Sequence, residues 1–486
     1  MRRILPTLLL AAIATAFGQA GPDSSQAPGP SVGERLDGVE SQVKILKRLR
    51  ENDIEDAAAI AAAAPRIQAD GGGFWIRSAD SSWQFRPRAI VRLGANWQLD
   101  NPGDNGSDIF QPQTIRFGFD ASLTKAVDAK FILDASKGNA AALKDGFFDL
   151  KFAPWAVARL GKFQVPLGWE RFVSPSDLLF YDRALPSQIA PDRDVGAQLG
   201  GKLLKGAVEY AAGVFDGGAD GTNIDKDANN DKDLYGRLWL VPAKTSGNEW
   251  FEGLGFGVGA SGGYHSNAVP SAYKTTTSGL TFFSWNSTDS LQGTGYRISP
   301  QLSWTAQSFW LWGEWIYSQE GIYRGAATTT TDSVGTGAAN KGLVYRTAKA
   351  TTYLGVSNLG QSAWQVGASW VVTGEDASAS GGVKPRHPFG ADGWGALEIA
   401  ARVSGLEVDP NAFHGAAYAD STKSAKSALQ YGAVAVWHIV RGTRLQFGYE
   451  RTQFEEGASV NPSAKVKVVR DAKPDNELFA ISSLAF

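Results

Sequence analysis

From residue 83 onward the chain is divided into segments of about ten residues in which apolar and polar side chains alternate, and this pattern constrains the fold more than any other feature. In the first segment, Trp83 to Gln98, Phe85 and Val91 fall on one face of an extended strand, and Arg86 and Arg92 fall on the other. No stretch beyond the N-terminal leader has the roughly 18 uninterrupted apolar residues of a membrane-spanning helix. The pattern therefore predicts an all-β protein, a transmembrane antiparallel β-barrel.

The alternating segments number sixteen and give the expected strands, with a seventeenth candidate at 346–357 placed in a loop because bacterial barrels have even strand numbers. The expected strands are 83–98, 114–124, 127–137, 144–152, 155–163, 194–203, 207–216, 233–243, 251–265, 295–306, 309–323, 363–374, 393–408, 429–440, 444–452 and 477–486. Short turns and long connections mostly alternate along the chain, as expected for the periplasmic and outer rims of such a barrel. The long connection at 375–392 is the exception, and either an enlarged turn or a shifted register explains it.

The N-terminal residues have a different organisation. Residues 1–20 read as a signal peptide, with a basic start, an apolar stretch and small residues before the cleavage point. A linker (21–33) precedes a periplasmic helix or short coiled coil (34–64), in which Leu36, Val39, Val43 and Leu46 form an apolar stripe. A single amphipathic helix without a partner is the alternative. A second linker (65–82) leads to the barrel (83–486), which is expected in the bacterial outer membrane, in contact with its lipid.

Composition excludes several other classes of protein. There is no cysteine, so disulfides, thiolate zinc sites and a cysteine nucleophile are excluded. With 47 Lys and Arg against 49 Asp and Glu, binding of nucleic acid through an overall positive field is not expected. The four histidines form no metal-binding pair, and no enzyme, metal or cofactor is predicted. An acidic series in residues 225–233 is similar to a calcium loop but lacks the glycine and glutamate at the required positions, which favours a solvated loop.

The face opposite the apolar series carries an excess of basic side chains. A barrel of sixteen strands is wide enough for an aqueous channel, and its inward charges determine which ions pass. Arg86, Arg88 and Arg92 lie together on the first strand and are the strongest single indication of a preference for anions. The alternative is that inward basic residues only pair with inward carboxylates on neighbouring strands.

Residues 161–200 carry a family resemblance. They contain GKFQVPLGWER, then DRAL, then RDVGAQL, and this block resembles the phosphate-selective porins, the O and P family of outer-membrane porins. Asp182 stands where the family usually has Glu. The resemblance implies a homotrimeric sixteen-stranded channel, and the strand count makes 164–193 the third outer loop, which porins fold into the lumen.

The expected function is diffusion of small anions such as phosphate through this channel, with selectivity set by inward basic residues and the third loop. The residues expected along the anion path are Arg86, Arg88, Arg92, Arg116, Lys130, Arg159, Lys162, Arg171, Arg183, Arg193 and Arg237. Two other functions stay open. One is a general or sugar porin with inward aromatic residues (Trp239, Trp310, Trp312 and Trp394), and the other is a hydrolase at the barrel rim that uses His438.

Overall fold

The computed structural model describes residues 31–70, 73–99, 108–136, 138, 140–225, 229–270, 272–324, 327–334, 344–352, 355–380, 382–390, 393–414, 418–460 and 467–486. The predicted signal peptide and most of the first linker lie outside these ranges. The chain divides into two units, Met1–Ala64 and Pro65–Phe486.

The described residues of the first unit form the helix α1 (Val32–Ala63). Ser31 caps its start, because its side chain accepts a hydrogen bond from the backbone of Glu34 while the Glu34 carboxylate accepts one from Ser31. The apolar stripe of α1 is exposed, with Val39 at 58% and Leu46 at 64%. Neither α1 nor any other helix among the described residues is long and apolar enough to cross a membrane.

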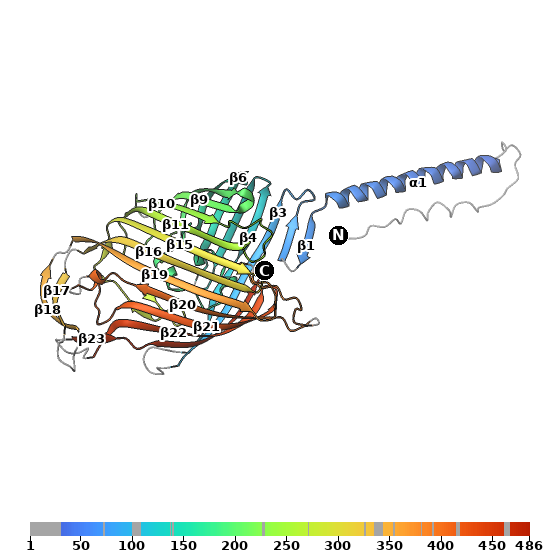
Figure 1. Cartoon of the computed structure of the whole chain (residues 1–486). Helices are drawn as coiled ribbons and strands as arrows, with labels where there is room; N and C mark the ends of the chain where they lie inside the picture. Colours follow the sequence, from blue (N-terminus) through green and yellow to red (C-terminus); the bar gives the residue numbers. More distant parts are fainter. Residues whose placement is uncertain are drawn as a thin grey trace, which may run out of the picture. The chain divides into compact units, whose positions relative to one another are not determined.

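In the second unit, sixteen strands among the described residues close into an antiparallel barrel, as predicted (Figure 1). The barrel strands are β3 (Gln84–Gln98), β4 (Ile109–Thr124), β5 (Val127–Asp134), β6 (Ala142–Ala153), β7 (Ala156–Gln164), β8 (Arg193–Leu203), β9 (Val208–Phe215), β10 (Asp233–Leu240), β11 (Gly253–His265), β15 (Gly293–Ala306), β16 (Phe309–Arg324), β19 (Gly355–Val371), β20 (Ala396–Glu407), β21 (Ala425–Val440), β22 (Thr443–Ser459) and β24 (Asp475–Ala485). The last strand closes the barrel by pairing with the first, with Ala485 opposite Ile90 and Glu477 opposite Gln98.

The smaller strands are not part of the barrel wall. A hairpin of β1 (Arg66–Asp70) and β2 (Gly73–Arg77) occupies the segment interpreted as a linker from the sequence. In the long outer connections, β12 (Tyr273–Lys274) pairs with β13 (Thr281–Phe283), β14 (Ser290–Leu291) pairs with β16, and β17 (Ala327–Val334) pairs with β18 (Val344–Thr352). The segment 346–357 is thus not a barrel strand of its own, but it is not a plain loop: it covers part of β18 and the start of β19. Strand β23 (Lys467–Asp471) pairs with β18 and β22.

Alternation along each strand separates two faces. On β22, Leu445 and Phe447 are exposed on the outside, whereas Arg444 and Gln446 are buried on the inside. On β19, Val366 is 53% exposed and its neighbour Gln365 is 1% exposed. The exposed series is the surface that faces lipid in an outer-membrane barrel, because only alternate residues of a strand can do so.

One half of the lumen is filled by outer loops. Aromatic residues of the β12–β13 region and of the loop between β20 and β21 pack against the inner wall of β16, β19, β20, β21 and β22. Phe283 lies at the centre, with its ring centroid 5.1 Å from Tyr273, 4.9 Å from Trp285 and 5.9 Å from Phe413. The open space is therefore displaced towards the wall formed by β3 to β8.

The connection between β19 and β20, residues 372–395, lies on the rim with the short turns, so it is an enlarged turn and the strand register is not shifted. It returns towards the barrel interior: Ala377 donates a backbone hydrogen bond to Gln307, and Val383 is buried against Val371 and Ala396.

Candidate functional site

The loop between β7 and β8, residues 165–192, lies inside the barrel. It contains three short 3₁₀ turns: η1 (Glu170–Phe172), η2 (Pro175–Asp177) and η3 (Leu185–Ile189). Pro175 and Pro186 stand at the first positions of the latter two, where the missing N–H costs no hydrogen bond. Most of the loop is buried, including Leu167, Phe180 and Tyr181.

Side chains of distant strands hold the backbone of this loop. Arg92 on β3 donates to the carbonyl oxygens of Phe180 at 3.0 Å and Tyr181 at 3.1 Å. Gln446 on β22 donates to the carbonyl oxygens of Leu178 at 2.9 Å and Leu179 at 2.6 Å. The loop therefore contacts strands on both sides of the barrel seam.

A carboxylate network fixes the other end of the loop. The Glu170 carboxylate accepts hydrogen bonds from the backbone of Ala184 at 2.7 Å and from Gln365 on β19 at 2.9 Å. Arg402 on β20 lies 3.3 Å from the same carboxylate and 2.7 Å from Glu450. These partners compensate the buried charges, so Arg402 has a structural role in holding the loop.

Three cavities lie beside the loop: two lie between it and the wall of β3 to β8, and the third is bordered by β3, by the ends of β21, β22 and β24, and by the 372–395 turn. The outer one, of about 280 Å³, is lined by five basic side chains and two carboxylates: Arg92, Arg116, Lys144, Arg171, Arg183, Asp182 and Asp192. The middle one, of about 160 Å³, shares Arg116, Arg171 and Pro175 with it. The third, of about 440 Å³ near the periplasmic rim, shares Arg88, Ala89, Ile90 and Ser174 with the middle one.

Asp192 is the main counter-charge of the outer cavity. Its carboxylate lies 2.7 Å from Arg193 and 3.6 Å from Arg171, and it also contacts Lys144. Burial alone would raise the pKa of Asp192, but the surrounding cations Arg193, Arg171 and Lys144 hold it well below its ordinary value. Asp192 is therefore ionised, and it is outnumbered by the basic groups around it.

Arg183 is a second loop arginine of the outer cavity. It donates to the carbonyl oxygens of Glu170 at 3.1 Å and Val173 at 2.6 Å. Burial lowers the pKa of the Arg183 guanidinium to about 10, against the opposing effect of Asp192. It stays charged at neutral pH. Its hydrogen bonds go to neutral carbonyls, which do not neutralise its positive charge.

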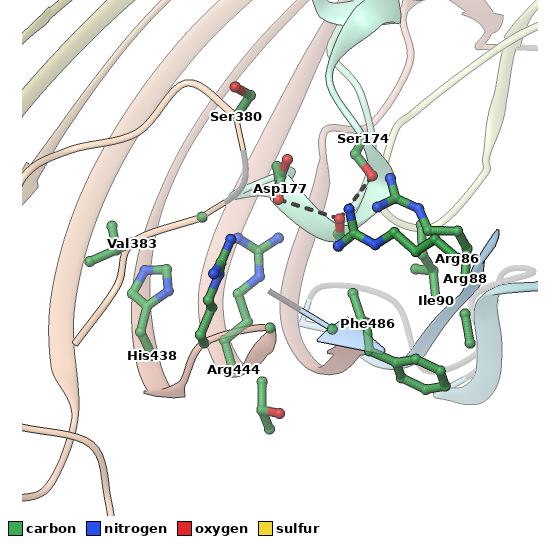
Figure 2. Close-up of a pocket in the computed structure, with 18 residues that line it drawn as sticks. Arg86, Arg88, Ile90, Ser174, Asp177, Ser380, Val383, His438, Arg444 and Phe486 are labelled. Atoms are coloured by element: carbon green, nitrogen blue, oxygen red, sulfur yellow. Dashed lines mark hydrogen bonds between the residues drawn. The ribbon is translucent and has the colours of Figure 1, made fainter. Parts of the chain in front are cut away.

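The periplasmic cavity is basic on two sides. Figure 2 shows His438 and Arg444 on one side and Arg86 and Arg88 on the other, with loop residues between them. Arg444 donates to the carbonyl oxygen of Leu178 at 2.5 Å, and Arg88 lies 3.3 Å from Asp120. On the loop, the Ser176 hydroxyl lies 2.8 Å from that of Ser174. Hydroxyls and guanidinium groups are donors that suit an oxyanion.

The residues expected from the sequence divide into two groups. Eight line the outer, middle or periplasmic cavity: Arg86, Arg88, Arg92, Arg116, Lys130, Arg171, Arg183 and Arg193. Several have carboxylate partners; Arg116 lies 2.8 Å from Asp134, Lys130 lies 3.7 Å from Asp120, and Arg193 lies 3.1 Å from Asp145.

The other three expected residues are placed differently. Lys162 is buried, paired with Asp225 and hydrogen-bonded to the Leu143 carbonyl at 2.8 Å. Arg237 lies 4.7 Å from the ring of Phe172 and donates to Gln301 at 3.1 Å, so it supports the loop. Arg159 pairs with Asp149 and lines a separate cavity of about 250 Å³, which shares Lys130 with the middle one.

Two lining residues were missed because of β-bulges. The register of β5 and β6 shifts between Ile132 and Leu133, and Lys144 is the extra residue. The register of β3 and β4 shifts between Arg92 and Leu93, and Gln113 is the extra residue there. Each bulge interrupts strict alternation and brings an additional polar side chain to the outer cavity. The adjacent Pro112 is the signal that could have indicated the second bulge.

The residues expected for the two alternative functions lie at different places in the barrel. Trp310 and Trp312 are buried, and Trp310 packs 5.6 Å from Trp169 beneath the loop. Trp239 is half-buried near Arg237, and Trp394 stacks near Trp437 at 6.2 Å. The His438 ring lies 2.8 Å from the Glu398 carboxylate.

The acidic series of residues 225–233 is partly described. Asp227 lies outside the described residues. Asp225 contacts Lys162, and Asp233 is buried with His265 at 2.9 Å and Arg297 at 3.5 Å. Among the described residues, no group of three or more potential ligands is arranged for a metal ion.

A closed sixteen-stranded barrel with an infolded loop defines the class of the protein, an outer-membrane porin. A sequence profile described as phosphate-selective porin O and P matches residues 91–434. This is more than half of the chain, and the chain belongs to this family. A search of curated proteins finds no match.

Solved structures with a similar fold are all distant in sequence. The in-vitro folded OmpT of Vibrio cholerae, in its trimer form, is 9% identical, with 83% of this chain and 100% of that chain covered and a TM-score of 0.47. The channel DcaP of Acinetobacter baumannii is 10% identical, with 86% and 99% covered and a TM-score of 0.46. The anion-selective porin of Comamonas acidovorans is 14% identical, with 83% and 100% covered and a TM-score of 0.45.

Proposed function

We propose that this porin conducts small anions, phosphate among them, along the three cavities beside the 165–192 loop. The observation that carries the proposal is the shared lining: Arg116 and Arg171 belong to the outer and middle cavities, and Arg88 belongs to the middle and periplasmic ones. An anion moving along this line always has a guanidinium group beside it.

The charge balance supports selectivity for anions. The outer cavity has five basic side chains against two carboxylates, and the hydrogen bonds of Arg92 and Arg183 go to neutral loop carbonyls. In a narrow passage with low-dielectric walls, such an excess raises the local concentration of anions. The planar guanidinium groups suit tetrahedral oxyanions. The infolded loop sets the selectivity by confining solutes to this basic side.

The test is to neutralise two arginines that line adjoining cavities. We expect Arg88→Gln with Arg116→Gln to lower the chloride-to-potassium permeability ratio severalfold, measured as the reversal potential of planar bilayers in a KCl gradient. Lys202→Gln with Lys205→Gln is the matched control, because it removes two charges near a periplasmic turn; Lys202 is exposed and pairs with Glu209. Equal ratios in all three proteins would refute the arginine path.

We further propose that the porin is a homotrimer and that residues 34–64 form a short coiled coil. The support is the family membership and the exposed apolar stripe of α1, which includes Leu36, Val39, Val43 and Leu46.

A further inference from the structure

The middle cavity differs from the outer one in carrying apolar side chains on two of its sides. On the barrel wall it is lined by Ile90 of β3 and Ile132 of β5, and on the loop it is lined by Phe172, Val173 and Pro175. The lining of the outer cavity is, by contrast, almost entirely polar. The path therefore changes at this point from a polar passage to an amphipathic one.

The register of the strands creates the apolar part of the wall. Ile90 follows Arg88 on the inward face of β3, so an apolar side chain interrupts the series of arginines there. Ile132 lies two strands away, because Arg88 is opposite Gly118 of β4 and Gly118 is opposite Ile132. A Cβ atom at Gly118 would lie 1.9 Å from the carbonyl oxygen of Phe131, so this position on β4 does not accommodate a side chain. The wall at this level therefore presents Ile132 without a neighbouring side chain on β4.

The loop supplies an aromatic ring to the same cavity. Phe172, in η1, is 45% exposed although the loop lies inside the barrel, and the guanidinium group of Arg237 lies 4.7 Å from its ring centroid. The neighbouring Val173 is buried. Apolar surface that is exposed to water is unfavourable, and a solute that covers it gains free energy. The arrangement thus favours a solute with an apolar part.

Basic side chains surround these apolar ones. The cavity is lined by five of them, against the single lining carboxylate of Asp145: Arg88, Arg116, Lys130, Arg171 and Arg193. Arg116 and Arg171 also line the outer cavity and Arg88 also lines the periplasmic one, so guanidinium groups stand at both ends. A guanidinium group matches a planar carboxylate in a bidentate geometry. Inorganic phosphate, in contrast, has no apolar part and loses hydration beside apolar side chains.

We propose that the middle cavity is a subsite for small organic carboxylates. The carboxylate group binds at Arg116 and Arg171, and an apolar ring or short branched chain packs against Phe172 and the two isoleucines. The inference rests on the proposed anion path and adds a class of solute to it. Organic anions with an apolar body then bind at this point more tightly than acetate, which has the same charged group and almost no body.

The experiment measures how benzoate, acetate and phosphate block the chloride current of single channels in planar bilayers at neutral pH, where both carboxylic acids are ionised. Benzoate is expected to halve the current at a concentration about tenfold lower than acetate does, because its ring removes apolar surface from water. Equal blocking by benzoate and acetate would refute the subsite.

Matched variants separate the polarity of the wall from its shape. Ile90→Thr with Ile132→Thr makes the wall polar, whereas Ile90→Val with Ile132→Val gives the same branched shape and keeps it apolar. The threonine pair should weaken the block by benzoate severalfold and leave the block by phosphate unchanged, and the valine pair should stay close to the unmodified porin. Equal losses in both pairs would overturn the inference, since shape alone would then hold the ring.

A second pair of variants lies outside the barrel strands. Phe172→Gln should weaken the block by benzoate, and Phe172→Leu should retain most of it, because leucine keeps an apolar side chain at this position. Heat-modifiable mobility on gels confirms that each barrel is folded. Equal blocking by benzoate in these two loop variants would also count against the subsite.

Failure of the subsite and failure of the anion path give different results. If benzoate blocks no better than acetate while Arg88→Gln with Arg116→Gln still lowers the chloride-to-potassium permeability ratio, only the subsite is lost. If the arginine variant leaves that ratio unchanged, the anion path itself is wrong and the subsite is lost with it.

Discussion

At the scale of single residues, the inward basic side chains differ in the groups that bind their charged ends. Arg116 and Arg193 have carboxylate partners, whereas Arg92 and Arg183 bind backbone carbonyls of the loop. Alternation along the strands predicted the inward orientation of Arg92 and Arg116, but it does not apply to Arg183 and Arg193, which fall in the loop predicted at 164–193. It did not predict their partners, because a partner such as Asp192 comes from the loop, whose path depends on the assembled barrel.

Asp192 is expected to stabilise the 165–192 loop in its position inside the barrel. Asp192→Asn leaves Arg171, Arg193 and Lys144 without their shared counter-charge, and breaking a buried ion pair in this way costs about 3–5 kcal/mol. Hydrogen exchange of the amides of residues 165–192 measures the effect at neutral pH as a loss of protection. Retained protection in the variant would show that the wall side chains alone hold the loop.

The same carboxylate gives a pH dependence with a defined sign. Because the pKa of Asp192 is lower in the folded protein than its ordinary value of 3.8, its contribution is fully present above that value. The contribution is lost as the pH falls through the still lower folded pKa. Loop protection in the unmodified porin should therefore be constant from pH 8 to about 4 and decrease only below that, whereas Asp192→Asn should lack this acid step.

At the scale of elements, the sequence predicted the strand order and closure well but made several strands too short at their outer ends. Strand β19 begins at Gly355 and not at 363, and β22 continues to Ser459 and not to 452. Beyond the lipid, no apolar outer face is required, so an outward residue such as Asn358 can be polar and the strand continues without an apolar series. The position of the enlarged turn at 372–395 could not be predicted from the sequence, since the turn contacts Gln307, which is far from it along the chain.

The infolded loop depends on a few wall donors, and Gln446 is the clearest. Replacing Gln446 by Leu leaves the carbonyl group of Leu179 without this donor, whereas that of Leu178 keeps Arg444, and a buried unsatisfied polar group costs about 1–3 kcal/mol. We expect noisier single-channel currents as the loop moves. Gln453→Leu, on the exposed face of the same strand, should leave the current noise unchanged. If the single-channel currents of Gln446→Leu are no noisier than those of the unmodified porin, Arg92 and Arg402 suffice to hold the loop in place.

At the scale of the whole molecule, the division into two units predicts separable roles. A chain lacking residues 21–64 keeps every strand of the barrel and should conduct with unchanged single-channel conductance, whereas its trimers should dissociate at lower temperature. Semi-native gel electrophoresis over a temperature series measures the second effect. Trimers of equal thermal stability would remove the coiled coil from the proposal, and altered conductance would show that α1 affects the channel.

The contents of the lumen also limit the order in which the protein can assemble. Arg92 and Gln446 hold adjacent loop residues from opposite ends of the barrel sequence, and they come near each other only when β24 has paired with β3. The loop thus has no complete binding surface on an open sheet. Circularisation of the sheet comes first, and insertion of the loop is a late event with the kinetics of long-range contacts. An intermediate trapped before insertion would be a wide, leaky cylinder with little discrimination between solutes.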